Sequence, residues 1–293
     1  MNVMALFMLT GSVAAVTNNN ATCLYVHVHV AKNGGRTVYY HLADLVSSNR
    51  VRGPTCFFGL LQPVCCGSGT EPQKKFAKQY VCGQCRFASA EWRFADVASM
   101  GLAGPKSRLL TLVRSPVGRT VSGVQQALHS GENFSFKTMK EWAANVGKEK
   151  TSWQDVGYGY GDQQTSWLLG SKVNFTNIVP KFDANYWFVG VVERMWHSLC
   201  ALDYMLGAFE RAKCHCGAPG APATSASKSG RRSLAYAHGV QTVNDVFDTE
   251  TLKVIQSSIH LDEILFAHAV TRLSQLLLQI EAHNPGLQLV KCY

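Results

Sequence analysis

Short apolar runs alternate along this chain with longer stretches whose apolar residues recur at helical spacing. Runs rich in β-branched and aromatic residues predict buried strands over 24–30, 108–113 and 186–192, and a shorter run predicts a strand over 79–82. The helical spacing predicts helices over residues 36–46, 91–100, 117–129, 138–146, 162–169, 193–209, 248–259 and 261–283. Strands that alternate with helices indicate an α/β fold, with a central parallel sheet flanked by helices on both faces.

The ends and loops of the chain suggest one domain, over residues 23–293, after a separate N-terminal segment. Residues 1–22 hold an apolar stretch followed by small residues, which resembles a signal peptide or anchor without its basic start. A disordered or strand-forming start is the alternative. Residues 49–78 lack a clear period, and we expect an irregular excursion there. Residues 214–232 are rich in Gly, Pro, Ala and Ser, which predicts a mobile loop.

Composition excludes several classes of protein. Hydrophobic residues make up 46% and charged residues 16%, which is incompatible with a disordered chain. No apolar run approaches the roughly 18 residues of a membrane span. Lys and Arg exceed Asp and Glu by 28 − 19 = 9, so the chain suits an anionic partner: nucleic acid, a phosphate ligand or an acidic glycan. No nucleic-acid-binding module is recognisable, so we expect no nucleic-acid partner.

Ten cysteines allow disulfides in an oxidising compartment, or buried thiols. The pairs Cys82/Cys85 and Cys214/Cys216 are about 130 residues apart, much further than the spacing in zinc fingers or ribbons, so we expect no metal site. N-x-S/T sequons, which weakly support a secretory route, stand at Asn20, Asn133 and Asn174.

The turn after the first predicted strand has the composition of an anion site. It reads Lys32-Asn33-Gly34-Gly35-Arg36-Thr37. Glycines let backbone N–H groups approach an anion, and the following helix offers its positive N-terminus. Lys32 adds a charge and Thr37 a hydroxyl donor. A Walker loop is absent, and a plain tight turn with a solvated lysine is the alternative.

A second turn follows the strand over 108–113. Arg114 stands at the carboxyl end of that strand, Pro116 suits the first position of the next helix, and Ser122 lies within it. A guanidinium and a hydroxyl can together bind one phosphate. The alternatives are a structural salt bridge for Arg114 and helix packing for Ser122.

Taken in order, the two turns resemble the cofactor signature of sulfotransferases that use 3′-phosphoadenosine 5′-phosphosulfate (PAPS). The shared patterns are Lys-x-Gly-Gly-x-Thr and Arg-x-Pro-x-x-Arg-x-x-Ser. Residues 187–199 resemble the V-G-x-x-E-R-x-x-x-S-L stretch of the membrane-type, glycan-directed branch, and residues 163–170 resemble its Q-x-x-x-L-L-G segment. The resemblance covers residues 24 to 210, roughly.

The resemblance implies a P-loop-NTPase-like three-layer sandwich and an enzyme that moves a sulfuryl group from PAPS to a hydroxyl of a carbohydrate acceptor. It implies the Golgi lumen as the compartment, with possible membrane association through the N-terminus. Arg114 and Ser122 would hold the 3′-phosphate, and Lys32 would also steady the bridging oxygen. The residues that would hold the 5′-phosphosulfate are Lys32, Asn33, Gly34, Gly35, Arg36 and Thr37.

The general base is where the chain departs from the family pattern. The related glycan enzymes often carry Gly-His just after the strand that precedes the arginine strand, and here Gln84 stands where that histidine is expected. A neutral glutamine cannot accept a proton. Glu91 is the candidate base, with a helix-terminal carboxylate as its alternative role. Another possibility is a histidine from elsewhere: His27, His29 or His41.

Two other functions stay open at this stage. The chain could be a catalytically silent relative that binds PAP or another polyanion, as Gln84 and the positive charge suggest. It could also be a nucleotide kinase or another P-loop enzyme, which the absence of a Walker loop disfavours.

Overall fold

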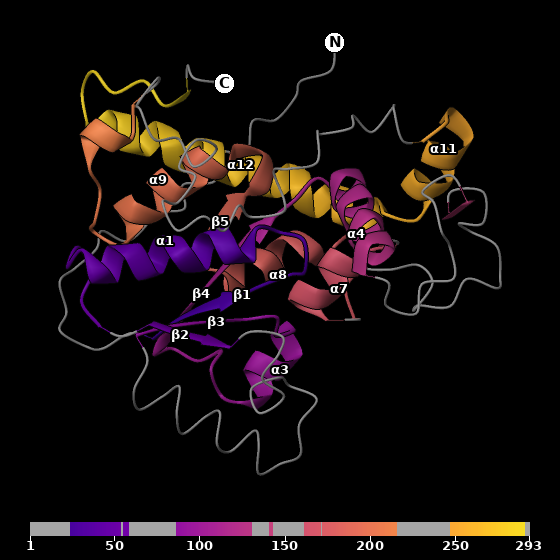
Figure 1. Ribbon diagram of the computed structural model, residues 1–293, viewed down its shortest axis with the longest axis horizontal. Helices are drawn as coiled ribbons and strands as arrows, with labels where there is room; N and C mark the ends of the chain where they lie inside the picture. The colour runs from indigo at the N-terminus through magenta and orange to yellow at the C-terminus, as the bar shows by residue number, and fades with distance from the viewer. Residues whose placement is uncertain are drawn as a thin grey trace.

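In the computed structural model, residues 24–53, 55–58, 86–130, 141–142, 161–170, 172–215 and 247–290 are described. Their core is a five-stranded sheet in the order β2-β3-β1-β4-β5, and every pair of neighbours is parallel (Figure 1). The strands are β1 (Leu24–Val28), β2 (Thr55–Phe58), β3 (Phe87–Ala90), β4 (Ser107–Val113) and β5 (Phe188–Val191).

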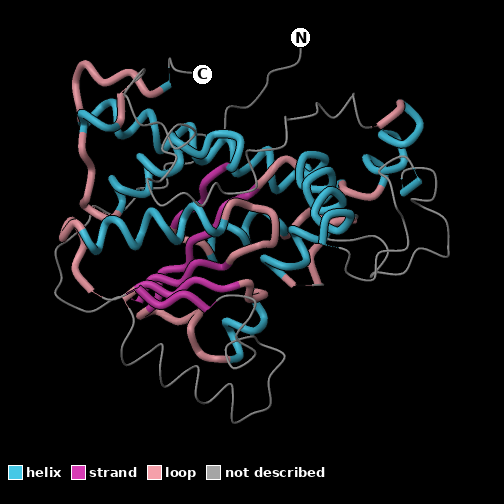
Figure 2. Tube along the Cα trace, in the orientation of Figure 1, coloured by secondary structure: helices cyan, strands magenta, loops and turns pink. Residues whose placement is uncertain are grey.

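Helices pack on both faces of the sheet; in Figure 2 most of them are drawn above or beside the strands, and a short helix lies below. His41 of α1 bonds to Asp203 of α9, so these two helices share one layer. On the opposite face, α3 and α8 flank Leu109 of β4. The helices are α1 (Gly35–Ser47), α3 (Phe94–Ser99), α4 (Pro116–Ser130), α7 (Gln163–Leu169), α8 (Ile178–Asn185), α9 (Met195–Met205), α11 (Thr249–Ser257) and α12 (His260–His283), with 3-10 turns η2 (Val192–Arg194) and η3 (Arg211–Lys213).

The sheet is buried on both sides. Every residue of β1, β3 and β5 is buried, as are the last five of β4. Covered parallel strands carry continuous apolar runs for this reason, and that is the pattern by which β1, β4 and β5 were predicted. The predicted α/β class, with a parallel sheet between helical layers, is confirmed.

Most predicted elements are found within one to three residues of their expected bounds. The strands over 24–30, 108–113 and 186–192 are β1, β4 and β5. Of the predicted helix over 138–146, only residues 141–142 are described, and they are helical. The predicted strand over 79–82 lies outside the described residues.

Three elements were not predicted. β2 lies inside 49–78, where we expected no regular structure, and its four residues are too few to show a period. β3 reads Phe-Ala-Ser-Ala and has little β propensity. α8 contains Pro180, which speaks against a helix, but as the third residue it falls in the first turn, where proline is tolerated.

The cysteines allowed disulfides, and the structure contains one among the described residues. Cys200 of α9 and Cys214 form a disulfide, with an S–S distance of 2.14 Å. Cys214 was expected to begin the mobile loop over 214–232, but it is buried, and the rest of that loop from residue 216 lies outside the described residues. Residues 1–22 lie outside them too. Among the helices that the structure describes, none has the length and apolar character needed to cross a membrane.

Candidate functional site

The two predicted anion-binding turns contact each other directly. β1 and β4 are neighbours in a parallel sheet, so both turns leave the sheet at its carboxyl edge. Arg114 Nη1 donates a hydrogen bond of 3.0 Å to the carbonyl oxygen of Lys32. The structure therefore brings together two turns whose key residues are 82 positions apart in the sequence.

The first turn is shaped by packing within the chain. Lys32 and Gly34 both have a φ of 71°, the left-handed conformation that favours glycine. A Cβ at Gly34 would lie 2.5 Å from the Met195 Cε, and a Cβ at Gly35 would lie 2.2 Å from atoms of the His29 ring. The sequence suggested that these glycines let the backbone approach an anion. The structure gives each of them a further reason, which is close contact with a neighbouring side chain.

Helix α4 directs one face toward both cations. Gly118, Ser122 and Gln126 are spaced by four residues and so share a side of the helix. A Cβ at Gly118 would lie 3.7 Å from Arg114 Nε, and Gln126 Oε1 accepts a hydrogen bond from Lys32 Nζ. Ser122, which is half-buried, lies between these two points on the same face. This places its hydroxyl on the side of α4 predicted for phosphate binding.

The cations at this edge influence one another. Burial lowers the pKa of Lys32, and the neighbouring Arg114 and Arg36 lower it further, while Glu91 opposes them. Like charges held close together disfavour their own charged form, and an anion placed among them favours it. The group Lys32, Arg36 and Arg114 thus has the electrostatics of an anion site. Arg36 is exposed, whereas Lys32 and Arg114 are half-buried.

Glu91 follows directly on the carboxyl end of β3, the strand beside β1. Burial raises the pKa of Glu91, and Lys32 and Arg36 lower it. Its Oε1 lies 3.7 Å from His29 Nδ1. The pKa of His29 is lowered to about 4, first by burial and then by Lys32 and Arg36, so the ring is neutral at pH 7. A carboxylate therefore stands beside the lysine turn, as its candidate role requires.

The three histidines considered as bases have different surroundings. His27 and His29 stack at 5.6 Å between ring centroids, which confirms that they share a face of the first strand. His27 is buried, and its Nδ1 lies 2.8 Å from Ser89 Oγ. His41 Nε2 lies 2.5 Å from Asp203 Oδ1, so its ring is engaged with α9. Of the three, His29 alone is placed beside Glu91.

Two interpretations of the base region need correction. The strand before β4 is β3, which begins at Phe87, so Gln84 precedes that strand, and Glu91 is the residue that follows it. The position at which the resemblance places a base, directly after this strand, is therefore Glu91, seven residues beyond Gln84. Nor is Glu91 the acid at the start of the next helix. That helix begins at Phe94, and its first-turn acid is Asp96, which accepts a hydrogen bond from Arg93 N at 3.0 Å.

Polar residues that the sequence analysis did not single out support the second turn. Glu193 Oε1 accepts a hydrogen bond of 2.9 Å from Ser115 N, just before α4 begins. Gln164 bonds to both the N–H and the carbonyl of Arg114. Gln164 does begin the Q-x-x-x-L-L-G segment, which was a signal for it. Asp262 of α12, distant in sequence, accepts the N–H of Gln164.

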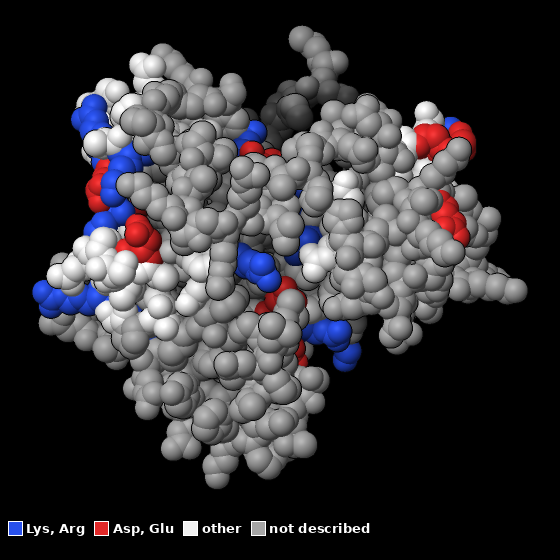
Figure 3. Space-filling model, in the orientation of Figure 1, with Lys and Arg blue, Asp and Glu red and all other residues white. Residues whose placement is uncertain are grey.

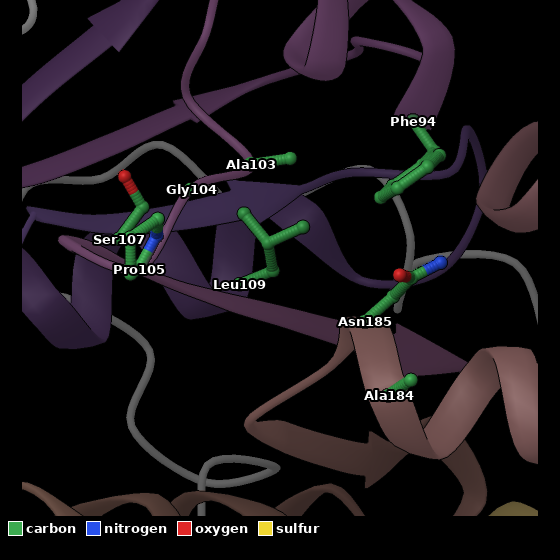
Figure 4. A pocket seen from close by; sticks show the side chains of 8 residues that line it. All are labelled: Phe94, Ala103, Gly104, Pro105, Ser107, Leu109, Ala184 and Asn185. Carbon is green, nitrogen blue, oxygen red and sulfur yellow. The ribbon is translucent and has the colours of Figure 1, made fainter.

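A hollow of about 310 Å³ lies away from these residues, around Leu109 of β4. In Figure 4, Leu109 lies between the loop before β4 and the end of α8. None of the predicted site residues lines this hollow. Its lining is mostly small or apolar and consists of Phe94, Ala103, Gly104, Pro105, Ser107, Leu109, Ala184 and Asn185.

Basic side chains of the described residues do not form one continuous surface on the face in Figure 3. They occur in separate groups, several with an acidic side chain beside them.

Comparison with known proteins adds no family: no family model matches the chain, and no curated protein matches it.

Proposed function

We propose that this chain is a sulfotransferase that moves a sulfuryl group from PAPS to a hydroxyl of a carbohydrate acceptor. The observation that carries the proposal is the 3.0 Å hydrogen bond from Arg114 to the Lys32 carbonyl. It joins the two turns that the resemblance assigns to the two ends of one nucleotide. A ligand with anionic groups at two positions suits this pair of turns.

The donors fit that ligand in kind and in number. Lys32 and Arg36 supply charge at the first turn, where Thr37 adds a hydroxyl and the backbone from Asn33 to Gly35 leads into the start of α1. Arg114 supplies a guanidinium at the second turn, and Ser122 a hydroxyl two turns into α4. PAPS supplies an activated sulfuryl group when bound. Lys32 stabilises the negative charge that develops as the bond to that group breaks.

Glu91 is the base in this proposal. Its carboxylate removes the proton of the attacking acceptor hydroxyl, so the acceptor oxygen bonds to sulfur as the bridging oxygen leaves with PAP. The burial that raises the pKa of Glu91 makes it a better proton acceptor, and the nearby Lys32 keeps it ionised. The position directly after the strand beside β1 supports this role, because it faces the lysine turn.

The acceptor and the compartment rest on less local features. The Cys200–Cys214 disulfide favours an oxidising compartment such as the Golgi lumen. The positive net charge favours an acidic glycan among carbohydrate acceptors.

The first experiment measures PAP binding by calorimetry, with two arginine variants. Arg114→Ala removes a charge-assisted contact worth about 1.5–3 kcal/mol, so PAP should bind between about tenfold and a hundredfold more weakly. Arg108→Ala, in the same strand but near its opposite end, is the matched control and should keep the wild-type affinity. Absence of PAP binding by the wild-type chain, or ATP hydrolysis without PAP affinity, would contradict the proposal.

The second experiment follows transfer from labelled PAPS to a panel of polysaccharides. Glu91→Gln keeps the size of the side chain but cannot accept the proton, so transfer should fall by two to four orders of magnitude, roughly, at unchanged PAP affinity. PAP binding without transfer to any acceptor would instead identify a silent, polyanion-binding relative.

A further inference from the structure

Two buried amide side chains link the turns of the candidate site. Asn33 and Gln164 are 1% and 0% exposed. Asn33 Nδ2 donates to the carbonyl of Leu112 at 2.9 Å, and it also donates to Gln164 Oε1. Leu112 lies in β4, two residues before Arg114, so Asn33 ties the lysine turn to the end of the arginine strand.

Gln164 continues this link to Arg114 itself. Its Oε1 accepts the N–H of Arg114 at 3.0 Å, and its Nε2 donates to the carbonyl of Arg114 at 3.2 Å. The side-chain amide of Gln164 therefore holds both the backbone N–H and the backbone carbonyl of Arg114. The same Oε1 also accepts a hydrogen bond from Asn33, so this one oxygen atom contacts both turns.

The bracket formed by Asn33 and Gln164 is itself anchored. Asp262, which is fully buried on α12, accepts the backbone N–H of Gln164 at 3.1 Å and of Thr165 at 2.6 Å. Its Oδ2 also lies 3.6 Å from Arg119 Nη2 of α4. A hydrogen bond between buried groups is stronger than one in water, and a buried polar group that loses its partner is costly, so these bonds hold the backbone that they join. The distance between the two turns is thus set from three other elements: β4, α7 and α12.

We propose that Asn33 and Gln164 are positioning residues that set the spacing between the two turns, so that the site selects nucleotides phosphorylated on both the 5′ and the 3′ side. The inference rests on the proposed function, since it concerns the same site. Two anion sites held at a fixed distance bind the second phosphate as an intramolecular event, at little further entropic cost. If the hydrogen bonds of Asn33 and Gln164 are lost, the distance between the turns is no longer fixed and that advantage disappears. Each turn still keeps its basic side chains and can bind a single phosphate.

The test compares three nucleotides as probes: PAP, 5′-AMP and 3′-AMP. In wild type, PAP should bind more tightly than either monophosphate. In Asn33→Ala and in Gln164→Ala, the ratio of PAP to monophosphate affinity should fall about tenfold, which corresponds to 1.4 kcal/mol. In Gln164→Ala, the affinities for 5′-AMP and 3′-AMP should change little. The double variant should lose less than the sum of the two single ones, because Asn33 and Gln164 share one hydrogen bond.

Gln163→Ala is the matched control, since the neighbouring glutamine bonds to Arg119 Nη1 at 2.7 Å instead of to Arg114. Its affinity ratio should stay at the wild-type value. If an alanine variant does not fold by circular dichroism, Asp262→Asn replaces it. That isosteric change weakens the anchor of Gln164 and should lower the ratio in the same direction.

The outcomes separate the two proposals. A wild-type chain that does not bind PAP overturns the proposed function and the inference with it. A wild-type chain that binds PAP, with variants whose affinities for all three nucleotides fall equally or not at all, overturns only the inference.

Discussion

The two ends of the parallel sheet hold their cations in different ways. At the carboxyl end, Lys32, Arg36 and Arg114 are close enough for the two arginines to lower the pKa of the lysine. At the amino end, Arg108 lies over two aromatic rings, 5.9 Å from the centre of Tyr25 and 5.1 Å from that of Trp187. Cations over ring faces are already stabilised by the ring.

An accumulation of basic residues therefore does not by itself mark a binding site. The cations of the amino end are part of the packing of the sheet. Those of the carboxyl end repel one another, at turns whose backbone is fixed by buried amides, and an anionic ligand would relieve that repulsion. The variants that follow test this difference between cations that pack on the sheet at the amino end and cations that repel one another at the carboxyl end.

The largest effect on stability is expected from a methyl group at the carboxyl end. In Gly35→Ala the new Cβ would lie 2.2 Å from the His29 ring, which is itself stacked on His27. Overpacking of this kind costs about 1–3 kcal/mol of the free energy of unfolding. Urea denaturation of the variant and the wild type measures it.

Gly104 provides the matched control at the other end of the sheet. A Cβ there meets only the carbonyl oxygen of Gly101, at 3.8 Å, so Gly104→Ala should be close to neutral. Adding His29→Ala to Gly35→Ala should restore part of the loss, because the clashing ring is gone. Equal effects of the two glycine substitutions would mean that the first turn is not as tightly packed as described.

A smaller effect concerns pH and also belongs to the carboxyl end. The pKa of His29 is lowered from 6.5 to about 4 by burial, so its contribution to stability is present above pH 6.5 and is lost as the pH falls through 4. The pKa of Asp262 is raised from 3.8 to about 6 by burial against the pull of Arg119, so its contribution is present below pH 3.8 and is lost as the pH rises through 6. Between about pH 6 and about pH 4 the two contributions change in opposite directions.

Asp262→Asn removes the titrating carboxyl group, and with it the contribution that offsets the effect of His29. The free energy of unfolding should then fall more steeply between pH 6.5 and pH 4 than it does in wild type, and urea denaturation at several pH values measures the slope. Asp44→Asn, on the exposed side of α1, should keep the wild-type slope. A slope unchanged by Asp262→Asn would show that the buried carboxyl is not the opposing group.

Much of the fold could be predicted because burial leaves a mark on sequence. β1, β4 and β5 are covered on both faces and carry long apolar runs, and the helices between them show their period. β3 could not be predicted in this way. Its Phe-Ala-Ser-Ala is held by pairing with β1 and β2 on either side, which is a tertiary contact that its four residues do not encode.

The parts of the candidate site that lie in short sequence motifs could be predicted, and the parts that depend on contacts between distant segments could not. Lys32 and Arg114 each stand in a short motif next to a strand, so the sequence could pair them. Because β3 was not predicted, the position of the family's histidine was assigned to Gln84, although the residue that directly follows the strand is Glu91. The bracket could not be derived at all, because Asn33 and Gln164 are 131 residues apart and meet only when β1, β4 and α7 assemble.

The smallest effect is expected at the amino end of the sheet. Arg108→Met keeps an unbranched side chain that can pack along the rings but removes the guanidinium over Tyr25 and Trp187. The loss should be about 0.5–1 kcal/mol in the free energy of unfolding, as for a partly exposed cation–π contact. PAP affinity should not change, since Arg108 lies at the opposite end of β4 from Arg114. A variant with normal stability but weaker PAP binding would contradict the division, because the ligand would then depend on both ends of the sheet.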